Sequence, residues 1–155
     1  MTARPVKRTR SGEYEIRLSN EERDLLRGLG PRMREVLADE TDPVLGRLFP
    51  VAYPLDEERQ AEYALLVRSE LLESHLAALA TLEETIDATR LDEERLAAWM
   101  RALNEVRLVL GVRLKVTEEG DERPRDRADA RAPAFAIYDY LTWLQGEIID
   151  ELAGS

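Results

Sequence analysis

The sequence contains no cysteine. This absence excludes disulfide bonds, thiolate nucleophiles, zinc or iron–sulfur centres with cysteine ligands, and thiol-based redox sensing by this chain itself. Hydrophobic runs are short as well: none approaches the roughly 18 residues that cross a bilayer, and residues 1–10 lack the apolar stretch of a signal peptide. The sequence therefore predicts a cytoplasmic protein without a membrane segment.

Histidine is almost as scarce, since His75 is the only one in the chain. Its neighbour Ser74 cannot act with it as a nucleophile, because adjacent side chains on a helix diverge by about 100°. A di-iron bundle site needs two Glu-x-x-His pairs, and no phosphate-binding or calcium-binding loop motif is present. The sequence predicts no enzyme, no catalytic or metal-binding residue and no cofactor, and it places His75 as a satisfied histidine at the edge of an apolar stripe.

Carboxylates are plentiful on the helix that carries His75, and we expect them to face solvent. A magnesium site formed by carboxylates alone is the alternative. The residues are Glu70, Glu73, Glu83, Glu84 and Asp87.

Negative charge dominates the composition, with 32 acidic and 22 basic residues and a formal net charge of −10. An acidic protein of this size repels phosphate backbones, so we do not expect direct nucleic-acid binding. The first twelve residues are the exception, because they carry four cations and no acid. We interpret this basic arm as an edge strand protected against aggregation, with contact to a phosphate or an acidic partner as the alternative. The four cations are Arg4, Lys7, Arg8 and Arg10.

Hydrophobic periodicity indicates a mainly α fold, a helical bundle of four to five helices with a small N-terminal β-hairpin. A composition of 44% hydrophobic and 35% charged residues is typical of a folded protein, and we expect one domain over residues 1–155. The expected segments are a hairpin at 6–18, helices over 19–116, a flexible charged loop at 117–133 and a C-terminal helix at 134–152.

Local signals predict where the first helices begin and end. Ser19 and Glu22 form a capping box that opens a helix at this point. Pro31 removes a backbone donor from that helix and predicts a kink or break near Leu29. A short helical piece follows within residues 41–50.

A loop at residues 47–58 separates this piece from a long third helix. We expect the loop to be ordered and pinned by Phe49 and Tyr53, because polar linkers rarely contain aromatic residues in this way. Asp56 caps the third helix, which runs to about Asp87. Its predicted inward stripe consists of Leu65, Leu72, Leu76, Leu79 and Ile86.

A fourth helix is predicted from Glu93 to about Lys115, although its tail also alternates like a strand. Asn104, Arg107 and Gly111 lie on one stripe of this helix. Gly111 lets a neighbouring backbone approach closely, and a buried Arg107 requires a paired acid. The acids considered for that pair are Glu70, Glu73, Asp139 and Glu147.

The C-terminal helix carries apolar side chains on more than one face. This pattern predicts that the helix packs centrally or contributes to a subunit interface, and we expect a homodimer. The residues expected to have a structural or partner-binding role are Asn104, Arg107, Gly111, Arg113, Tyr140 and Trp143.

Three stretches resemble, in order and spacing, an actinobacterial family of unknown function that includes the AosR oxidative-stress response regulators. The similarity runs from about Tyr14 to Leu152. The stretches are GRLFPVAYPLDEE at 46–58, LNEVRLVLGVRLKVTEEG at 103–120 and YDYLTWLQGEIIDEL at 138–152.

The resemblance implies a non-enzymatic regulator of the oxidative-stress response that contacts the transcription machinery, with a protein partner such as a sigma factor or RNA polymerase. It also implies oxidation-sensing cysteines near the N-terminus, and residues 1–20 contain none. The residues alone leave a second function open, a structural helical homodimer or adaptor with no direct transcriptional role.

Overall fold

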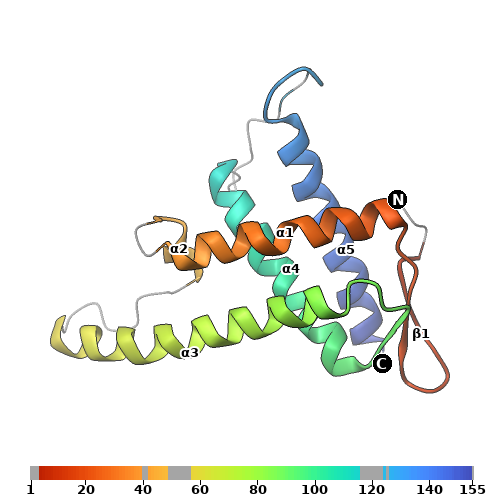
Figure 1. The fold of residues 1–155 in the computed structure, drawn as a ribbon, viewed down its shortest axis with the longest axis horizontal. Helices are drawn as coiled ribbons and strands as arrows, with labels where there is room; N and C mark the ends of the chain where they lie inside the picture. The colour runs from red at the N-terminus through yellow and green to blue at the C-terminus, as the bar shows by residue number, and fades with distance from the viewer. Residues whose placement is uncertain (1–3, 40–41, 49–56, 116–123, 125, 155) are drawn as a thin grey trace.

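A computed structural model of the chain describes residues 4–39, 42–48, 57–115, 124 and 126–154. Figure 1 shows helices that cross one another, with a small sheet at one side of the molecule near both chain ends. The predicted fold class, a mainly α bundle with a small N-terminal hairpin, is confirmed. The elements in chain order are β1 (Val6–Arg8), β2 (Tyr14–Ile16), α1 (Asn20–Ala38), α2 (Leu45–Leu48), α3 (Glu57–Glu84), β3 (Arg90–Leu91), α4 (Glu93–Arg113) and α5 (Ala132–Ala153).

The predicted hairpin is present, and the sheet contains one strand more than predicted. β1 and β2 pair antiparallel around a turn in which Gly12 has a φ of 90°, a value that favours glycine. β3 adds to the other edge of β2, with Tyr14 opposite Leu91. The sheet rests on the helices, because the backbone N–H of Arg8 donates to Glu151 of α5 at 2.9 Å.

Helix α1 runs through Pro31, so a break near Leu29, one of the two predicted outcomes, does not occur. The capping box at its start is confirmed, with Ser19 and Glu22 each bonding the other's backbone. The second half of the helix is fixed to α3, since Arg34 donates through Nε to Glu83 at 3.0 Å. Packing on both sides of Pro31 therefore compensates for the hydrogen bond that proline removes.

The core lies where α3, α4 and α5 pack together and meet α1 and the sheet. α4 contacts both α3 and α5, and its Trp99 and Leu103 are buried. Trp99 also donates its indole N–H to the Thr85 hydroxyl at 2.6 Å. On α5, three side chains are fully buried, namely Leu141, Leu144 and Ile148.

Helix α3 extends beyond the helices that cover its other half (Figure 1). Leu79 and Ile86 are buried as predicted, but Leu65 is 76% exposed and its neighbour Leu66 is 64% exposed. The prediction of Leu65 as an inward residue is therefore wrong. The apolar spacing along α3 continues past the point where its packing partners end.

The boundaries of the later helices also differ from prediction. α4 ends at Arg113 and stays helical to that point, which confirms the helical reading of this segment. α5 begins at Ala132, so the predicted loop at 117–133 ends earlier than expected. Residues 126–131 form turns, in which Asp126 and Asp129 accept backbone hydrogen bonds.

Several predictions concern residues that lie outside the described part of the chain. They concern the aromatic contacts of Phe49 and Tyr53, the cap at Asp56, and residues 117–123 and 125 of the charged loop. Among the helices of the described part of the chain, none combines the length and hydropathy of a membrane span.

Candidate functional site

The predicted stripe on α4 faces Tyr138 of α5, and we call this place the α4–α5 seam (Asn104, Arg107, Gly111 and Tyr138). Arg107 Nη2 donates to Asn104 Oδ1 at 3.3 Å, and the Arg107 guanidinium carbon lies 6.0 Å from the centre of the Tyr138 ring. A Cβ atom added to Gly111 would lie 3.3 Å from Tyr138 Cε2. The prediction was that Gly111 makes room for a neighbouring backbone. In the structure it makes room for the aromatic ring of Tyr138 instead.

The acid that a buried Arg107 would require is not present among the described residues, because Arg107 is not fully buried. Arg107 is only half-buried, and among the described residues it forms no ion pair. Its Nε is buried without a hydrogen-bond partner in that part of the structure. The aromatic face of Tyr138 stands where an acid was expected, and such a contact is weaker than a buried ion pair.

Arg113 lies at the end of α4 and reaches the segment before α2. Its Nη2 donates to Asp42 Oδ2 at 2.8 Å, while the other Asp42 oxygen accepts from the Val44 backbone. The Arg113 side chain stays 54% exposed in this ion pair, and exposed pairs of this kind contribute little to stability. Arg113 is thus an outer residue that has a charge partner within the chain.

Tyr140 connects α5 to the first turn of α1. Its hydroxyl donates to Glu22 Oε2 at 2.7 Å, and its ring lies 5.8 Å from that of Trp143. Burial, and then the hydrogen bond to the negative Glu22, raise the pKa of Tyr140 above its ordinary value of 10.0. Both aromatic residues are half-buried within the chain, so the structure gives Tyr140 a contact between helices.

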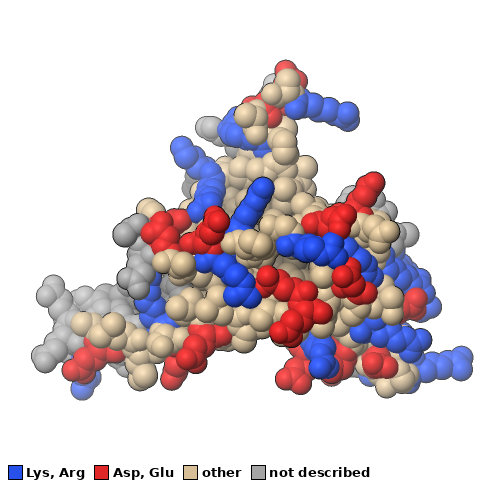
Figure 2. All heavy atoms as spheres, viewed as in Figure 1, with Lys and Arg blue, Asp and Glu red and all other residues tan. Residues whose placement is uncertain are grey.

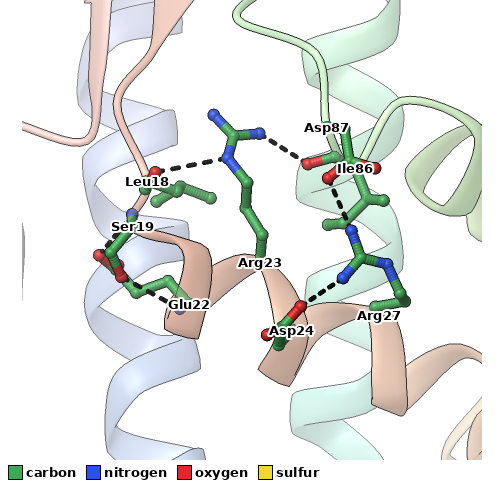
Figure 3. Close-up of polar contacts among 8 residues, drawn as sticks. All are labelled: Leu18, Ser19, Glu22, Arg23, Asp24, Arg27, Ile86 and Asp87. Atoms are coloured by element: carbon green, nitrogen blue, oxygen red, sulfur yellow. Dashed lines mark hydrogen bonds and ion pairs between the residues drawn. The ribbon is translucent and has the colours of Figure 1, made fainter.

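Arg23 has a structural role that no pattern considered above predicted. Its guanidinium is buried and donates only to backbone carbonyls: Nη1 to Ile86 at 2.6 Å and to Ala88 at 2.9 Å, Nη2 to Ile16 at 3.2 Å, and Nε to Leu18 at 3.3 Å. Figure 3 shows the side chain between the end of β2 and the segment after α3. One side chain therefore joins α1, the sheet and the end of α3.

A signal for Arg23 was present in the sequence. The buried positions 23, 26, 30, 33 and 37 of α1 follow the helical spacing of three and four, so Arg23 begins the apolar stripe. The same region contains the capping box of Ser19 and Glu22, which Figure 3 also shows. We call this region the α1 corner (Ser19, Glu22, Arg23 and Tyr140).

A second ionisable pair lies between α3 and α4. His75 is 7% exposed and its Nδ1 contacts Glu105 Oε1, while Glu105 is 4% exposed. Arg101 Nε approaches the same carboxylate oxygen at 3.4 Å. His75 is therefore interior, not at the edge as predicted, because it shares the α3 stripe with Leu79.

The carboxylates expected to face solvent do so except Glu83, which is half-buried. Two of the five bond to arginines of α1, and one of these is Asp87, which stays exposed and accepts from Arg27 Nη2 at 2.6 Å. Glu70, Glu73 and Glu84 are exposed, and Glu83 accepts from Arg34. Within the residues that the structure describes, no group of three or more His, Cys, Asp or Glu side chains is placed to hold a metal ion.

Two grooves open on the described surface. The α3–α4 groove, about 510 Å³, is lined by small residues such as Ala77 and Ala98 and by charges of both signs such as Glu94 and Arg101. The α1–α4–α5 groove, about 310 Å³, has an almost entirely apolar lining with two arginines. Its lining residues are Leu29, Arg32, Met33, Val36, Val106, Val109, Leu110, Arg113, Ala130, Pro133, Ala134 and Ile137.

The interior charged groups and the grooves differ in what they contact. The interior ionisable groups Arg23, His75 and Glu105 bond to other parts of the fold. Of the two grooves, one combines small residues with charges of both signs and the other combines apolar residues with two arginines. A binding surface for another molecule is what this arrangement can provide.

Comparison with known proteins places the chain in a family. The family model described as "Domain of unknown function (DUF2017)" matches residues 3–152. The chain belongs to this family, as the three resembling stretches predicted.

The similar curated proteins are mycobacterial. The chain is 33% identical over 134 residues to proteins named "Oxidative stress regulator AosR" from Mycobacterium tuberculosis (strain ATCC 25618 / H37Rv) and Mycobacterium bovis, a match that covers 74% of this chain and 60% of each relative. It is 32% identical over 131 residues to the "Putative oxidative stress regulator AosR" of Mycobacterium leprae, over 70% of this chain and 57% of the relative. The chain therefore spans about 60% of the length of these relatives. No solved structure matches it.

Proposed function

We propose that this chain is a non-enzymatic regulatory protein of the oxidative-stress response that acts in the cytoplasm by contact with the transcription machinery. The observation that carries the proposal is its similarity to relatives named oxidative stress regulators, which extends over about three-quarters of the chain. The partner is a protein such as a sigma factor or RNA polymerase.

The interior charged side chains bond within the chain, which supports a function in protein binding. Arg23 donates to four carbonyls of the chain, and His75 is bonded to Glu105 between two helices. These groups stabilise the arrangement of the helices, and a bound substrate would have no direct access to them because each is more than nine-tenths buried. The outer surface, with its grooves, is then the part that recognises a partner.

Because the chain has no cysteine, thiol-based oxidant sensing belongs in this proposal to another component. The chain has no thiol to oxidise, so the proposal needs a partner or an upstream molecule that responds to the oxidant. The chain then transmits the signal by binding.

Affinity purification tests the proposal. A tagged full chain is isolated from its host with and without peroxide, and the co-purifying proteins are quantified by mass spectrometry. We expect RNA polymerase subunits or a sigma factor at least tenfold above a tag-only control. Recovery of neither under both conditions contradicts the proposal.

A structural homodimer or adaptor is the second candidate function. The exposure of Leu65 and Leu66 on the outer half of α3 favours it, because adjacent exposed leucines are a frequent feature of protein contacts. Light scattering on the purified chain and on a Leu65→Glu, Leu66→Glu variant measures whether this face forms a dimer. A dimer that the variant abolishes, together with an unchanged transcript profile in a deletion strain, favours this function over the first.

A further inference from the structure

The α1–α4–α5 groove has the composition of a binding site for an apolar group. Its floor consists of side chains that belong to the core and still reach the surface, including Met33, Val36 and Val109. At about 310 Å³ the groove is at the lower end of the size range of ligand pockets, which are also predominantly apolar with a few polar groups. In Figure 2, uncharged atoms cover the surface where α4 and α5 emerge above α1, with lysine and arginine side chains near it.

The charged residues of this groove are both arginines. Arg113 comes from the end of α4 and is paired with Asp42. Arg32 comes from α1, is exposed, and forms no hydrogen bond or ion pair with another residue of the described chain. A cation left without an acid beside an apolar floor is complementary to a carboxylate attached to an apolar group.

The α3–α4 groove lacks this combination. Its lining is rich in alanine, and its charges include both Glu84 and Glu94 beside Arg95 and Arg101. Arg95 is held by Asp92, and Arg101 lies 3.4 Å from Glu105. The α3–α4 groove therefore offers neither an apolar floor of large side chains nor a cation without an acid.

From these features we infer that the α1–α4–α5 groove binds a segment of a protein partner in which a large apolar side chain lies next to an aspartate or glutamate. The apolar side chain covers Met33 and Val109, and the carboxylate pairs with Arg32. This binding mode is that of an amphipathic segment in a groove between helices. The inference rests on the proposed function, which supplies a protein as the partner.

Site-specific photo-crosslinking in the native host tests the inference. The full chain carries p-benzoylphenylalanine in place of Ala130, an exposed residue that lines the groove. A matched chain carries it in place of Ala77, an exposed alanine of the α3–α4 groove. The crosslinked peptides are sequenced by mass spectrometry after peroxide treatment.

We expect position 130, and not position 77, to capture a segment in which Leu, Ile, Met or Phe lies within four residues of Asp or Glu. Adding Arg32→Glu is expected to lower the yield at position 130 at least tenfold, and Arg32→Lys is expected to retain most of it. Arg10→Glu makes the same change of charge at an exposed residue of the hairpin and is expected to leave the yield within twofold. Circular dichroism melting of each variant confirms that it is folded.

Four outcomes of the crosslinking overturn the inference: a captured segment without an acid, an equal yield from position 77, a yield that Arg32→Glu leaves unchanged, or capture of a second copy of this chain. A fatty acid that co-purifies with the chain in native mass spectrometry and blocks crosslinking also overturns it. If the captured segment has an apolar residue next to an acid but belongs to a protein unrelated to transcription, the groove assignment stands and the proposed function fails. If polymerase or sigma factor co-purifies and Arg32→Glu has no effect, the proposed function stands and the groove assignment fails.

Discussion

The α1 corner and the α4–α5 seam each bring an arginine below the surface, and they satisfy it in different ways. At the α1 corner, Arg23 donates to four backbone carbonyls, which come from the β2 end of the sheet and from the segment after α3. At the α4–α5 seam, Arg107 has one side-chain hydrogen bond at 3.3 Å and the face of Tyr138.

The difference shows what a buried cation needs. A guanidinium has five N–H donors in a fixed plane, so several carbonyls from different segments can satisfy it without an acid. Such a side chain specifies the relative position of those segments, because each carbonyl left without it remains buried. Arg107 has no comparable set of acceptors, so we expect the seam to contribute much less to stability.

Arg23→Ala tests the α1 corner and has the largest expected effect. The substitution leaves buried carbonyls without donors, and we expect the free energy of unfolding to fall by about 3–5 kcal/mol. In a chain of this length this is a decrease in Tm on the order of 10 °C. Urea denaturation and thermal melting measure it, with Arg10→Ala as the control. A loss below about 1 kcal/mol contradicts the role assigned to Arg23.

Tyr140→Phe removes the hydrogen bond that joins α5 to the α1 corner. We expect a loss of about 1 kcal/mol at neutral pH. Because the folded state holds the phenol proton more tightly than the unfolded chain, Tyr140 contributes stability below pH 10, and this contribution declines as the pH rises further. Urea denaturation at pH 8 to 11 measures the slope, which we expect to be shallower in the variant. Identical slopes in both proteins argue against the raised pKa.

Arg107→Ala tests the α4–α5 seam. We expect a loss of about 1 kcal/mol or less, because the side chain has one long hydrogen bond and a cation–π contact. A double-mutant cycle with Tyr138→Ala measures the coupling, expected at about 0.5–1 kcal/mol. A loss as large as that of Arg23→Ala would remove the contrast between the two regions.

Gly111→Ala has the smallest expected effect. Alanine favours a helix by about 1 kcal/mol over glycine, but its Cβ would lie 3.3 Å from the Tyr138 ring, which must move by a few tenths of an ångström. The two effects oppose each other, and we expect a net change within about 0.5 kcal/mol. Thermal melting measures it, and a large decrease in Tm shows that the Tyr138 ring is rigidly held.

The parts of the fold that the sequence predicted correctly depend on local signals. The hairpin follows from Ser11-Gly12 and the alternation of apolar residues in β2, and the start of α1 follows from the capping box. In contrast, β3 has only two residues, Arg90 and Leu91, and exists because β2 offers an edge. No local pattern identifies a strand of that length.

The differences from prediction depend on contacts between distant segments. Pro31 carries a real local cost, but the contacts of α1 on both sides of it keep the helix continuous. Leu65 fits the apolar spacing of α3, although the spacing cannot show where the neighbouring helices end. The requirement for a paired acid applies to fully buried cations, and Arg107 is only half-buried.

The candidate site also depends on contacts between distant segments, which the sequence does not show. The six residues selected from sequence lie at contacts within the chain or beside them, as Tyr140 and Arg113 show. The α1–α4–α5 groove combines residues of α1, α4 and α5 that are far apart in the sequence, so only the three-dimensional arrangement reveals it.

Transcription reconstituted from purified components tests the regulatory role most directly. RNA polymerase holoenzymes from the host, each with one sigma factor, transcribe an oxidant-induced promoter with and without the full chain. With at least one of these holoenzymes, we predict that an equimolar amount of the chain changes transcript yield at least threefold, and that Arg23→Ala loses this effect only above its lowered Tm. Unchanged yields at a tenfold molar excess of folded protein, with every sigma factor of the host, would contradict the role proposed for this chain.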